Sequence, residues 1–237
     1  MTSIVVFGGT GYAGSAIVRE ARERGHDVRV VTRHAPAEPV AGVTYRQVGD
    51  APVRELVAGA QAVVGALSPR NGSEGALPGV YRELADAAAA EGARLLVVGG
   101  FGSLRPEDGA PRLAEGADWP DWLRPEAMEM VAVLDGLRRT DGALDWVFVS
   151  PAQEFGARRE QGEPTGSYRV GGDVALFDDA GRSVLEVADF ADAILDEIER
   201  AQHHRAHISV VSGRRASGRM RGSVGHPMDP ARRSGDT

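Results

Sequence analysis

Short apolar runs alternate with longer amphipathic segments along most of the chain. The first run, 3–7, leads into a glycine-rich turn. The segment after the turn has apolar residues at helical spacing, namely Ala13, Ile17, Val18 and Ala21. Short continuous apolar runs are typical of strands buried on both faces, and helical spacing is typical of an amphipathic helix. The alternation therefore predicts a parallel sheet with helices on both faces.

The pattern continues to residue 211 and predicts one α/β domain over 1–211. We expect a doubly wound parallel sheet, a Rossmann fold, with a small substrate-side lobe made of loops and the C-terminal helix. The expected strands are 3–7, 28–32, 44–48, 62–66, 95–98, 146–149, 174–177 and 208–211. The first helix ends near Gly25, and the later helices are expected at 52–57, 80–91, 126–139 and 189–199.

The turn after the first strand carries the most specific pattern in the sequence. The spacing of Gly8, Gly11 and Gly14 lets the chain turn tightly, expose backbone N–H groups to a pyrophosphate and pack the next helix closely on the sheet. The amino end of that helix adds a positive dipole. A glycine-rich turn alone is weak evidence. Its place between a strand and a helix favours a dinucleotide site over an ordinary turn.

The end of the second expected strand bears on which nicotinamide dinucleotide is bound. A carboxylate there would hold the ribose 2′-hydroxyl of NAD, but the chain reads Thr32-Arg33-His34. A guanidinium binds a 2′-phosphate through charge-assisted hydrogen bonds. We therefore expect NADP(H) in preference to NAD(H), with Arg33 on the 2′-phosphate and Asp50 near the adenine. The alternative for Arg33 is a solvated surface arginine, and Asp50 also suits a helix-capping role, which is compatible with an adenine contact.

Composition removes several mechanisms. None of the 27 Lys+Arg residues is a lysine, and the chain has no cysteine. A Schiff base, a P-loop lysine, a thiol nucleophile, a cysteine-bound metal and a Tyr-x-x-x-Lys pair are therefore excluded. The absence of cysteine suits the cytoplasm, where we expect the protein. The net charge of −7 argues against a nucleic-acid partner, and the lengths of the apolar stretches predict neither a signal peptide nor a membrane span.

Charge is distributed unevenly between the body and the last residues. Segment 212–237 has six arginines and two aspartates, a net charge of +4, which leaves −11 for 1–211. Because this segment is also rich in Gly, Ser and Pro, we expect a disordered basic tail, with an electrostatic arm for an acidic neighbour as the alternative. The histidines His203, His204 and His207 lack a carboxylate cage in the sequence, so we expect a solvated surface cluster and no metal site.

Six segments in combination carry a family resemblance. They are 8–14, 31–33, 48–50, 95–104, 145–151 and 168–173. Together they resemble the NAD(P)H-binding branch of the atypical short-chain dehydrogenases, which includes proteins labelled NADH-flavin reductases and biliverdin reductase B-like and NmrA-like proteins. The resemblance covers about residues 3–211. It implies a Rossmann fold that binds NADP with its nicotinamide facing a shallow pocket.

The resemblance also implies which residues hold the cofactor. The pyrophosphate would be held by Gly8, Thr10, Gly11, Tyr12 and Gly14, the 2′-phosphate by Arg33 and the adenine by Asp50. The remaining cofactor contacts would come from Leu67, Ser68, Arg70, Gly99, Gly100, Phe101, Ser150, Pro151 and Ala152.

The sequence departs from its relatives at the catalytic pair. Flavin-reductase-like relatives often have Tyr-Lys at the start of the helix after the long loop, where this chain reads Trp122-Leu123-Arg124-Pro125. Leu123 has no proton to donate, and the pKa of an arginine is too high for a general acid. Hydride transfer to a flavin or quinone does not require a protein acid, so the missing pair is compatible with reductase activity.

The loop 104–124 is long and proline-rich, as lids and binding segments commonly are. The expected acceptor pocket consists of Trp119, Trp122, Met128, Gln153 and Phe155, where a planar acceptor would stack on an aromatic ring. Alternatively, the two tryptophans seal the loop against the core. Ser103 and Tyr168 are candidates for donating a proton through water.

These features predict an NADPH-dependent oxidoreductase that reduces a flavin, a quinone or a similar planar conjugated acceptor. A non-catalytic NADP-binding redox sensor of the NmrA type is the first alternative. The second is a tailoring reductase or isomerase on the same fold. The expected partner is a small-molecule acceptor, and a homodimer is a candidate assembly.

Overall fold

The computed structural model describes residues 1–49, 51–70, 73–160 and 162–213. Within them, one sheet runs in the strand order β3-β2-β1-β4-β5-β6-β8-β7. Neighbouring strands are parallel except for β7, which is antiparallel to β8. The strands are β1 (Ser3–Phe7), β2 (Asp27–Thr32), β3 (Thr44–Gln47), β4 (Ala62–Gly65), β5 (Arg94–Val98), β6 (Trp146–Ser150), β7 (Tyr168–Gly171) and β8 (Ala206–Ser212).

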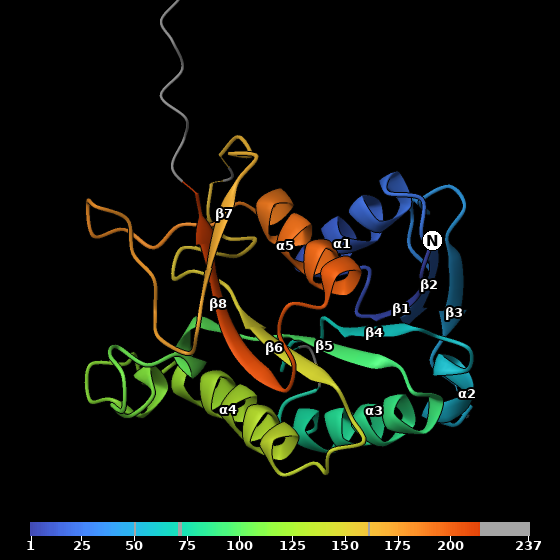
Figure 1. Cartoon of the computed structure of the whole chain (residues 1–237), viewed down its shortest axis with the longest axis horizontal. Coiled ribbons are helices and arrows are strands. Elements are labelled where there is room, and N and C mark those ends of the chain that lie inside the picture. Colours follow the sequence, from blue (N-terminus) through green and yellow to red (C-terminus); the bar gives the residue numbers. More distant parts are fainter. Residues whose placement is uncertain (50, 71–72, 161, 214–237) are drawn as a thin grey trace, which may run out of the picture.

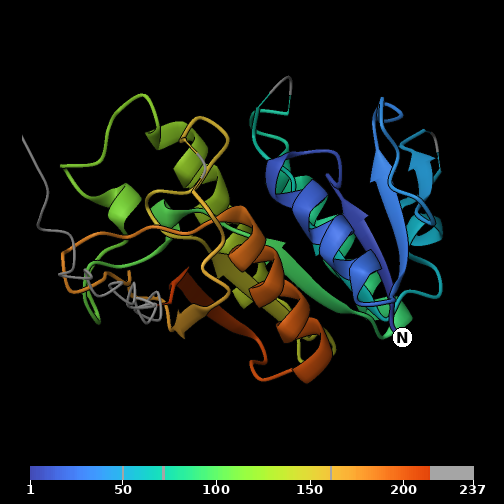
Figure 2. The same cartoon turned by 90° about the horizontal axis from the view of Figure 1, so that it is seen from above.

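Helices cover both faces of this sheet, as Figures 1 and 2 show. On one face α1 (Tyr12–Glu23) packs against α5 (Val187–Arg200). On the other, α3 (Leu77–Glu91) packs between the short α2 (Val53–Val57) and α4 (Arg124–Arg138). We expected α5 in the substrate-side lobe, but it belongs to the covering layer beside α1. No helix in the described part of the chain is long and apolar enough to cross a membrane.

Successive residues of each central strand pack alternately against the two helix layers. In β1, Ile4 and Val6 belong to the cluster under α1 and α5, whereas Val5 and Phe7 belong to the cluster under α2, α3 and α4. All four are buried. Because both faces are covered, the strands read as continuous apolar runs, which explains the pattern in the sequence.

One expected strand lies elsewhere. The segment 174–177 forms no strand, and Val174 makes only an isolated bridge to Arg105. The edge strand is instead β7, which lies outside the expected strands. Its central residues, Arg169 and Val170, are exposed. An edge strand of this kind buries little apolar surface, so it leaves a weak hydrophobic pattern.

The topology gathers several loops at one edge of the sheet. β1 lies between β2 and β4, so the strand order reverses there and leaves a crevice beyond the carboxyl ends of the strands. The glycine-rich turn follows β1, and the segments after β4, β5 and β6 reach the same edge. The fold thus brings the predicted cofactor segments together.

Candidate functional site

The glycine-rich turn has no space for larger residues. Gly8 adopts a φ of +79°, and a Cβ atom there would lie 2.4 Å from the carbonyl oxygen of Ala66. A Cβ atom at Gly14 would lie 2.2 Å from the carbonyl oxygen of Gly8. Gly11 N donates a hydrogen bond to that oxygen at 2.9 Å, and α1 begins at the next residue without a side-chain cap. The first turn of α1 therefore presents backbone N–H groups at this edge, as an anion site requires.

A cleft of about 370 Å³ opens beside this turn. It includes most of the predicted cofactor residues, namely Gly11, Tyr12, Leu67, Ser68, Arg70, Gly99, Gly100, Phe101, Pro151 and Ala152. It also includes four residues predicted for the acceptor side, namely Ser103, Trp119, Gln153 and Phe155. One continuous cleft thus joins the two predicted halves.

Four more predicted cofactor residues lie at this edge of the sheet but do not line the cleft. Gly8 and Gly14 form the back of the turn. Thr10 is exposed, and its Oγ1 lies 3.4 Å from Oγ1 of Thr32, the last residue of β2. Arg33 follows Thr32 directly and is exposed at the same edge. The predicted adenine contact, Asp50, and the predicted tail from residue 214 onward lie outside the described residues.

Ser150 faces the core and does not line the cleft. It is fully buried, and its Oγ forms a hydrogen bond of 2.9 Å with Nε2 of His207. Burial, together with the charge of the nearby Arg112 guanidinium, lowers the pKa of His207 to about 3. His207 is therefore neutral at physiological pH.

The three histidines do not form the solvated cluster that we expected. His207 is buried, whereas His203 pairs with Glu197 and His204 pairs with Asp145. Within the described residues no group of three His, Cys, Asp or Glu side chains is arranged to hold a metal ion.

Three residues predicted for the acceptor side lie away from the cleft. Trp122 is 73% exposed and Met128 is exposed on α4, and neither lines the cleft. Tyr168 donates a hydrogen bond to Asp196 of α5 at 2.6 Å. Burial and that carboxylate raise the pKa of Tyr168. Its position and its raised pKa therefore do not suit it to donate a proton in the cleft.

Residues on α4 and just before it take the places of Trp122 and Met128 in the cleft wall. They are Leu123, Glu126, Ala127 and Met130. Sequence reasoning missed them, although their helical spacing follows once α4 is known to begin at Arg124.

Arg124, which the sequence places where a Tyr-Lys pair was expected from the resemblance, holds the loop before α4 in place as a clamp. Its guanidinium donates hydrogen bonds to the carbonyl oxygens of Ala114 at 2.6 Å, Gly116 at 3.1 Å and Trp119 at 2.9 Å. The clamp fixes the loop that carries Trp119. A Cβ atom at Gly102 would lie 2.9 Å from the Trp119 ring, so the indole packs directly on the backbone that follows β5.

Aromatic contacts fix the opposite wall. The rings of Tyr12 and Phe155 meet edge to face with centroids 5.3 Å apart, and Phe155 contacts Phe190 of α5 at 4.9 Å. These contacts tie the loop after β6 to α1 and α5, which holds Phe155 at the cleft.

Two polar side-chain atoms at the acceptor end have no hydrogen-bond partner among the described residues. They are Oγ of Ser103 and Nε1 of Trp119, and both are buried. The backbone around Ser103 is fixed, because its N donates to Gly100 and its carbonyl oxygen accepts from Arg112 at 2.5 Å.

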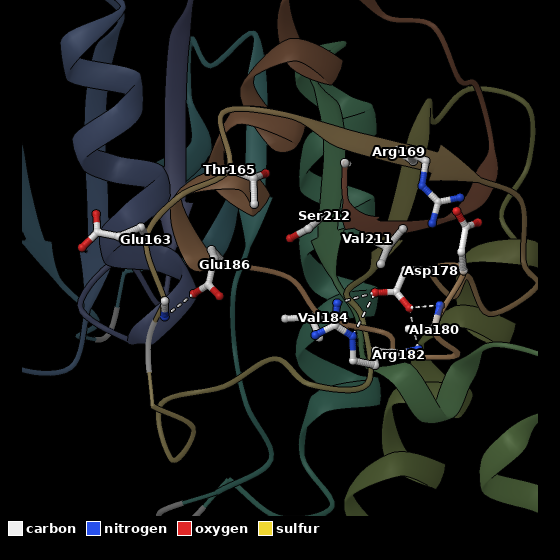
Figure 3. A pocket seen from close by; sticks show the side chains of 13 residues that line it. Glu163, Thr165, Arg169, Asp178, Ala180, Arg182, Val184, Glu186, Val211 and Ser212 are labelled. Carbon is white, nitrogen blue, oxygen red and sulfur yellow. Dashed lines mark hydrogen bonds and ion pairs between the residues drawn. The ribbon is translucent and has the colours of Figure 1, made fainter. Parts of the chain in front are cut away.

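A larger cavity of about 1,070 Å³ lies beside the ends of β7 and β8 (Figure 3). Two of its carboxylates already have partners. Asp178 accepts from the backbone N–H groups of Ala180 and Arg182 and from the Arg182 guanidinium, and Glu186 accepts from Gly162 N at 3.0 Å. No predicted cofactor residue in the described chain lines this cavity. The smaller cleft is therefore the candidate site.

The fold and the cleft are those of a Rossmann-type protein with a site suited to a dinucleotide. The chain belongs to the NAD(P)H-binding family, whose model matches residues 8–198.

Three similar proteins illustrate the family. The uncharacterized protein YwnB of Bacillus subtilis is 33% identical over 213 residues, which cover 88% of this chain and 98% of that protein. A proposed NADH-flavin reductase from Streptococcus pneumoniae has a TM-score of 0.78 at 30% identity, covering 90% of this chain and all of that one. A proposed epimerase from Bacteroides thetaiotaomicron has a TM-score of 0.77 at 31% identity, covering 89% and 97%.

Proposed function

We propose that the protein is an NADPH-dependent reductase that delivers hydride to a flavin, a quinone or a similar planar conjugated acceptor without a Tyr-Lys pair. The observation that carries this proposal is the single cleft in which the glycine-rich turn and the 99–101 backbone meet the ring of Trp119 and the loop of Phe155. A solved relative described as a proposed NADH-flavin reductase supports the same class of reaction.

The residues present fit the cofactor. A Cβ atom at Gly100 would meet nothing within 4 Å, so the space beside this part of the cleft lining is open, as a ring lying against it requires. When bound, the nicotinamide supplies the hydride. The protein would bind the diphosphate at Gly11 and the start of α1, and would hold the acceptor ring between Trp119 and Phe155.

The protein's role in this proposal is alignment and exclusion of water. The walls at the acceptor end are largely apolar and aromatic, with Leu123, Ala127 and Met130 beside Trp119. An acceptor held in such a site keeps a near-attack geometry. A reduced flavin or quinone can take its proton from solvent, so neither Leu123 nor Arg124 needs to supply one.

The preference for NADPH rests on Arg33. It follows β2 at the edge that carries the glycine-rich turn, and no carboxylate occupies that position. A guanidinium there stabilises a 2′-phosphate and gives a ribose hydroxyl no comparable contact.

The test is oxidation of NADPH by the purified protein with riboflavin, FMN or menadione as acceptor. We expect acceptor-dependent loss of the reduced nicotinamide absorbance, faster with NADPH than with NADH. Tight NADP binding without turnover of any of the three acceptors would exclude this activity and favour the non-catalytic redox sensor.

A further inference from the structure

The cleft contains two opposite charges that cancel each other. Among the described residues that line it, Arg70 and Glu126 are the only ones with a formal charge. Their side chains meet in a two-bond ion pair, with Nε to Oε2 at 2.9 Å and Nη2 to Oε1 at 2.7 Å. Such a side-on pair fixes both groups in direction as well as distance.

The two partners come from different segments of the chain. Arg70 lies in the segment after β4, and Glu126 lies in the first turn of α4. One turn further along α4, Glu129 accepts hydrogen bonds from the N–H groups of Gly75 at 2.9 Å and Leu77 at 2.8 Å. The same helix therefore also binds the start of α3. Because α4 is anchored to the start of α3, Glu126 holds the guanidinium of Arg70 in a defined position.

This arrangement leaves an anionic acceptor without a cation that it could use freely. It would have to displace Glu126 from Arg70, or lie beside the carboxylate with its own charge unpaired. Both alternatives carry a free-energy cost. An uncharged conjugated ring avoids this free-energy cost, because it brings no charge into the cleft. The remaining lining consists of glycine, apolar, aromatic and neutral polar residues.

We propose that the Arg70–Glu126 pair makes the lining of the cleft electrically neutral and thereby selects uncharged planar acceptors over anionic ones. The inference rests on the proposed function and names its substrate class, an uncharged isoalloxazine or quinone. Glu126 is the specificity-determining residue, because it occupies the guanidinium that a phosphate would otherwise bind.

The test compares riboflavin with FMN, which differ by one phosphate group. Dissociation constants for both flavins are measured by fluorescence quenching with saturating NADP⁺, and kcat/KM for both is measured with NADPH. The variants are Glu126→Gln, Arg70→Gln and the double variant Arg70→Gln/Glu126→Gln. Reading binding as well as turnover keeps the result interpretable if the chemistry is slow.

We expect the wild type to prefer riboflavin. Glu126→Gln should shift the ratio of the two dissociation constants toward FMN by about 3- to 10-fold, and Arg70→Gln should shift it away by a similar factor. The double variant restores neutrality and should return close to the wild-type ratio. The shift in Glu126→Gln should shrink in about 1 M salt, as a charge effect must.

A failure of the selectivity inference can be distinguished from a failure of the proposed function. If flavins bind and are reduced but Glu126→Gln leaves the ratio unchanged, or if the double variant behaves like a single one, the selectivity inference is wrong and the reductase proposal stands. If neither flavin binds any variant in the presence of NADP⁺, the flavin-reductase proposal falls, and the selectivity inference falls with it.

Discussion

The predicted cofactor half of the cleft is built mainly from backbone, whereas the predicted acceptor half is built from side chains held by arginines. On the cofactor side, glycines at strand ends leave N–H groups and flat peptide surfaces. On the acceptor side, Trp119 stays in place because Arg124 binds three carbonyl oxygens of its loop. A site built from backbone depends on positions where only glycine fits, whereas a site built from side chains depends on contacts between distant segments. The two halves should therefore respond differently to substitution.

The largest effect is expected from Gly14→Ala in the backbone half. The new Cβ atom would lie 2.2 Å from the Gly8 carbonyl oxygen and 2.9 Å from Gly9 Cα, so the turn must move. We expect NADP affinity to fall by about 1,000-fold and the free energy of unfolding by about 2–4 kcal/mol. Calorimetric titration and denaturant unfolding measure the two quantities.

The matched control is Gly136→Ala in α4, where a Cβ atom meets nothing within 4 Å. It should bind NADP normally and be stabilised by up to about 1 kcal/mol. Equal losses in the two variants would show that the glycine-rich turn has no special role.

Arg33→Asp tests the one place where the cofactor half is predicted to use a side chain. The carboxylate removes the guanidinium contact and repels a 2′-phosphate, so NADP affinity should fall by about 100-fold. NAD affinity should change little, because an aspartate can accept from the ribose hydroxyl. Titration of both dinucleotides checks the ratio. An unchanged preference would contradict our assignment of Arg33.

The buried polar layer at β6 and β8 predicts a pH dependence. The pKa of His207 is about 3 in the folded protein and about 6.5 in the unfolded chain, so the unfolded state binds the proton first. The contribution of neutral His207 to the free energy of unfolding is complete above about pH 6.5 and is lost as the pH falls toward 3. Between about pH 7 and 4.5, the wild type should lose about 2 kcal/mol more unfolding free energy than His207→Asn. Parallel pH profiles for the two proteins, measured by denaturant unfolding, would contradict the prediction.

The smallest effect is expected from Arg124→Gln in the acceptor half. Loss of the clamp loosens the Trp119 loop, so KM for the acceptor should rise about 10-fold while NADP affinity stays unchanged. Arg124→Lys should recover part of this loss, since a lysine retains the charge but not the fork.

Tyr168→Phe, outside the cleft, is the control for Arg124→Gln and should leave both constants unchanged. A fall in kcat with KM unchanged in Arg124→Gln would contradict a role limited to holding the Trp119 loop.

The contrast between the halves also explains what the sequence could predict. The turn at Gly8, Gly11 and Gly14 and the central strands follow from local patterns, and the structure places both as expected. The edge strand β7 and the partner of Tyr168 depend on chain segments that meet only in three dimensions. The clamp at Arg124 could not be predicted from the sequence either, because its partners are backbone carbonyl oxygens, which every residue carries.

The position of Trp119 gives the protein a built-in optical reporter. The three indoles sit in different surroundings: Trp146 in the core, Trp122 in solvent and Trp119 in the wall of the cleft. A coloured conjugated ring beside Trp119 will quench that emission more strongly than the emission of the exposed Trp122. Occupancy can therefore be followed by light from the native chain, without an attached dye.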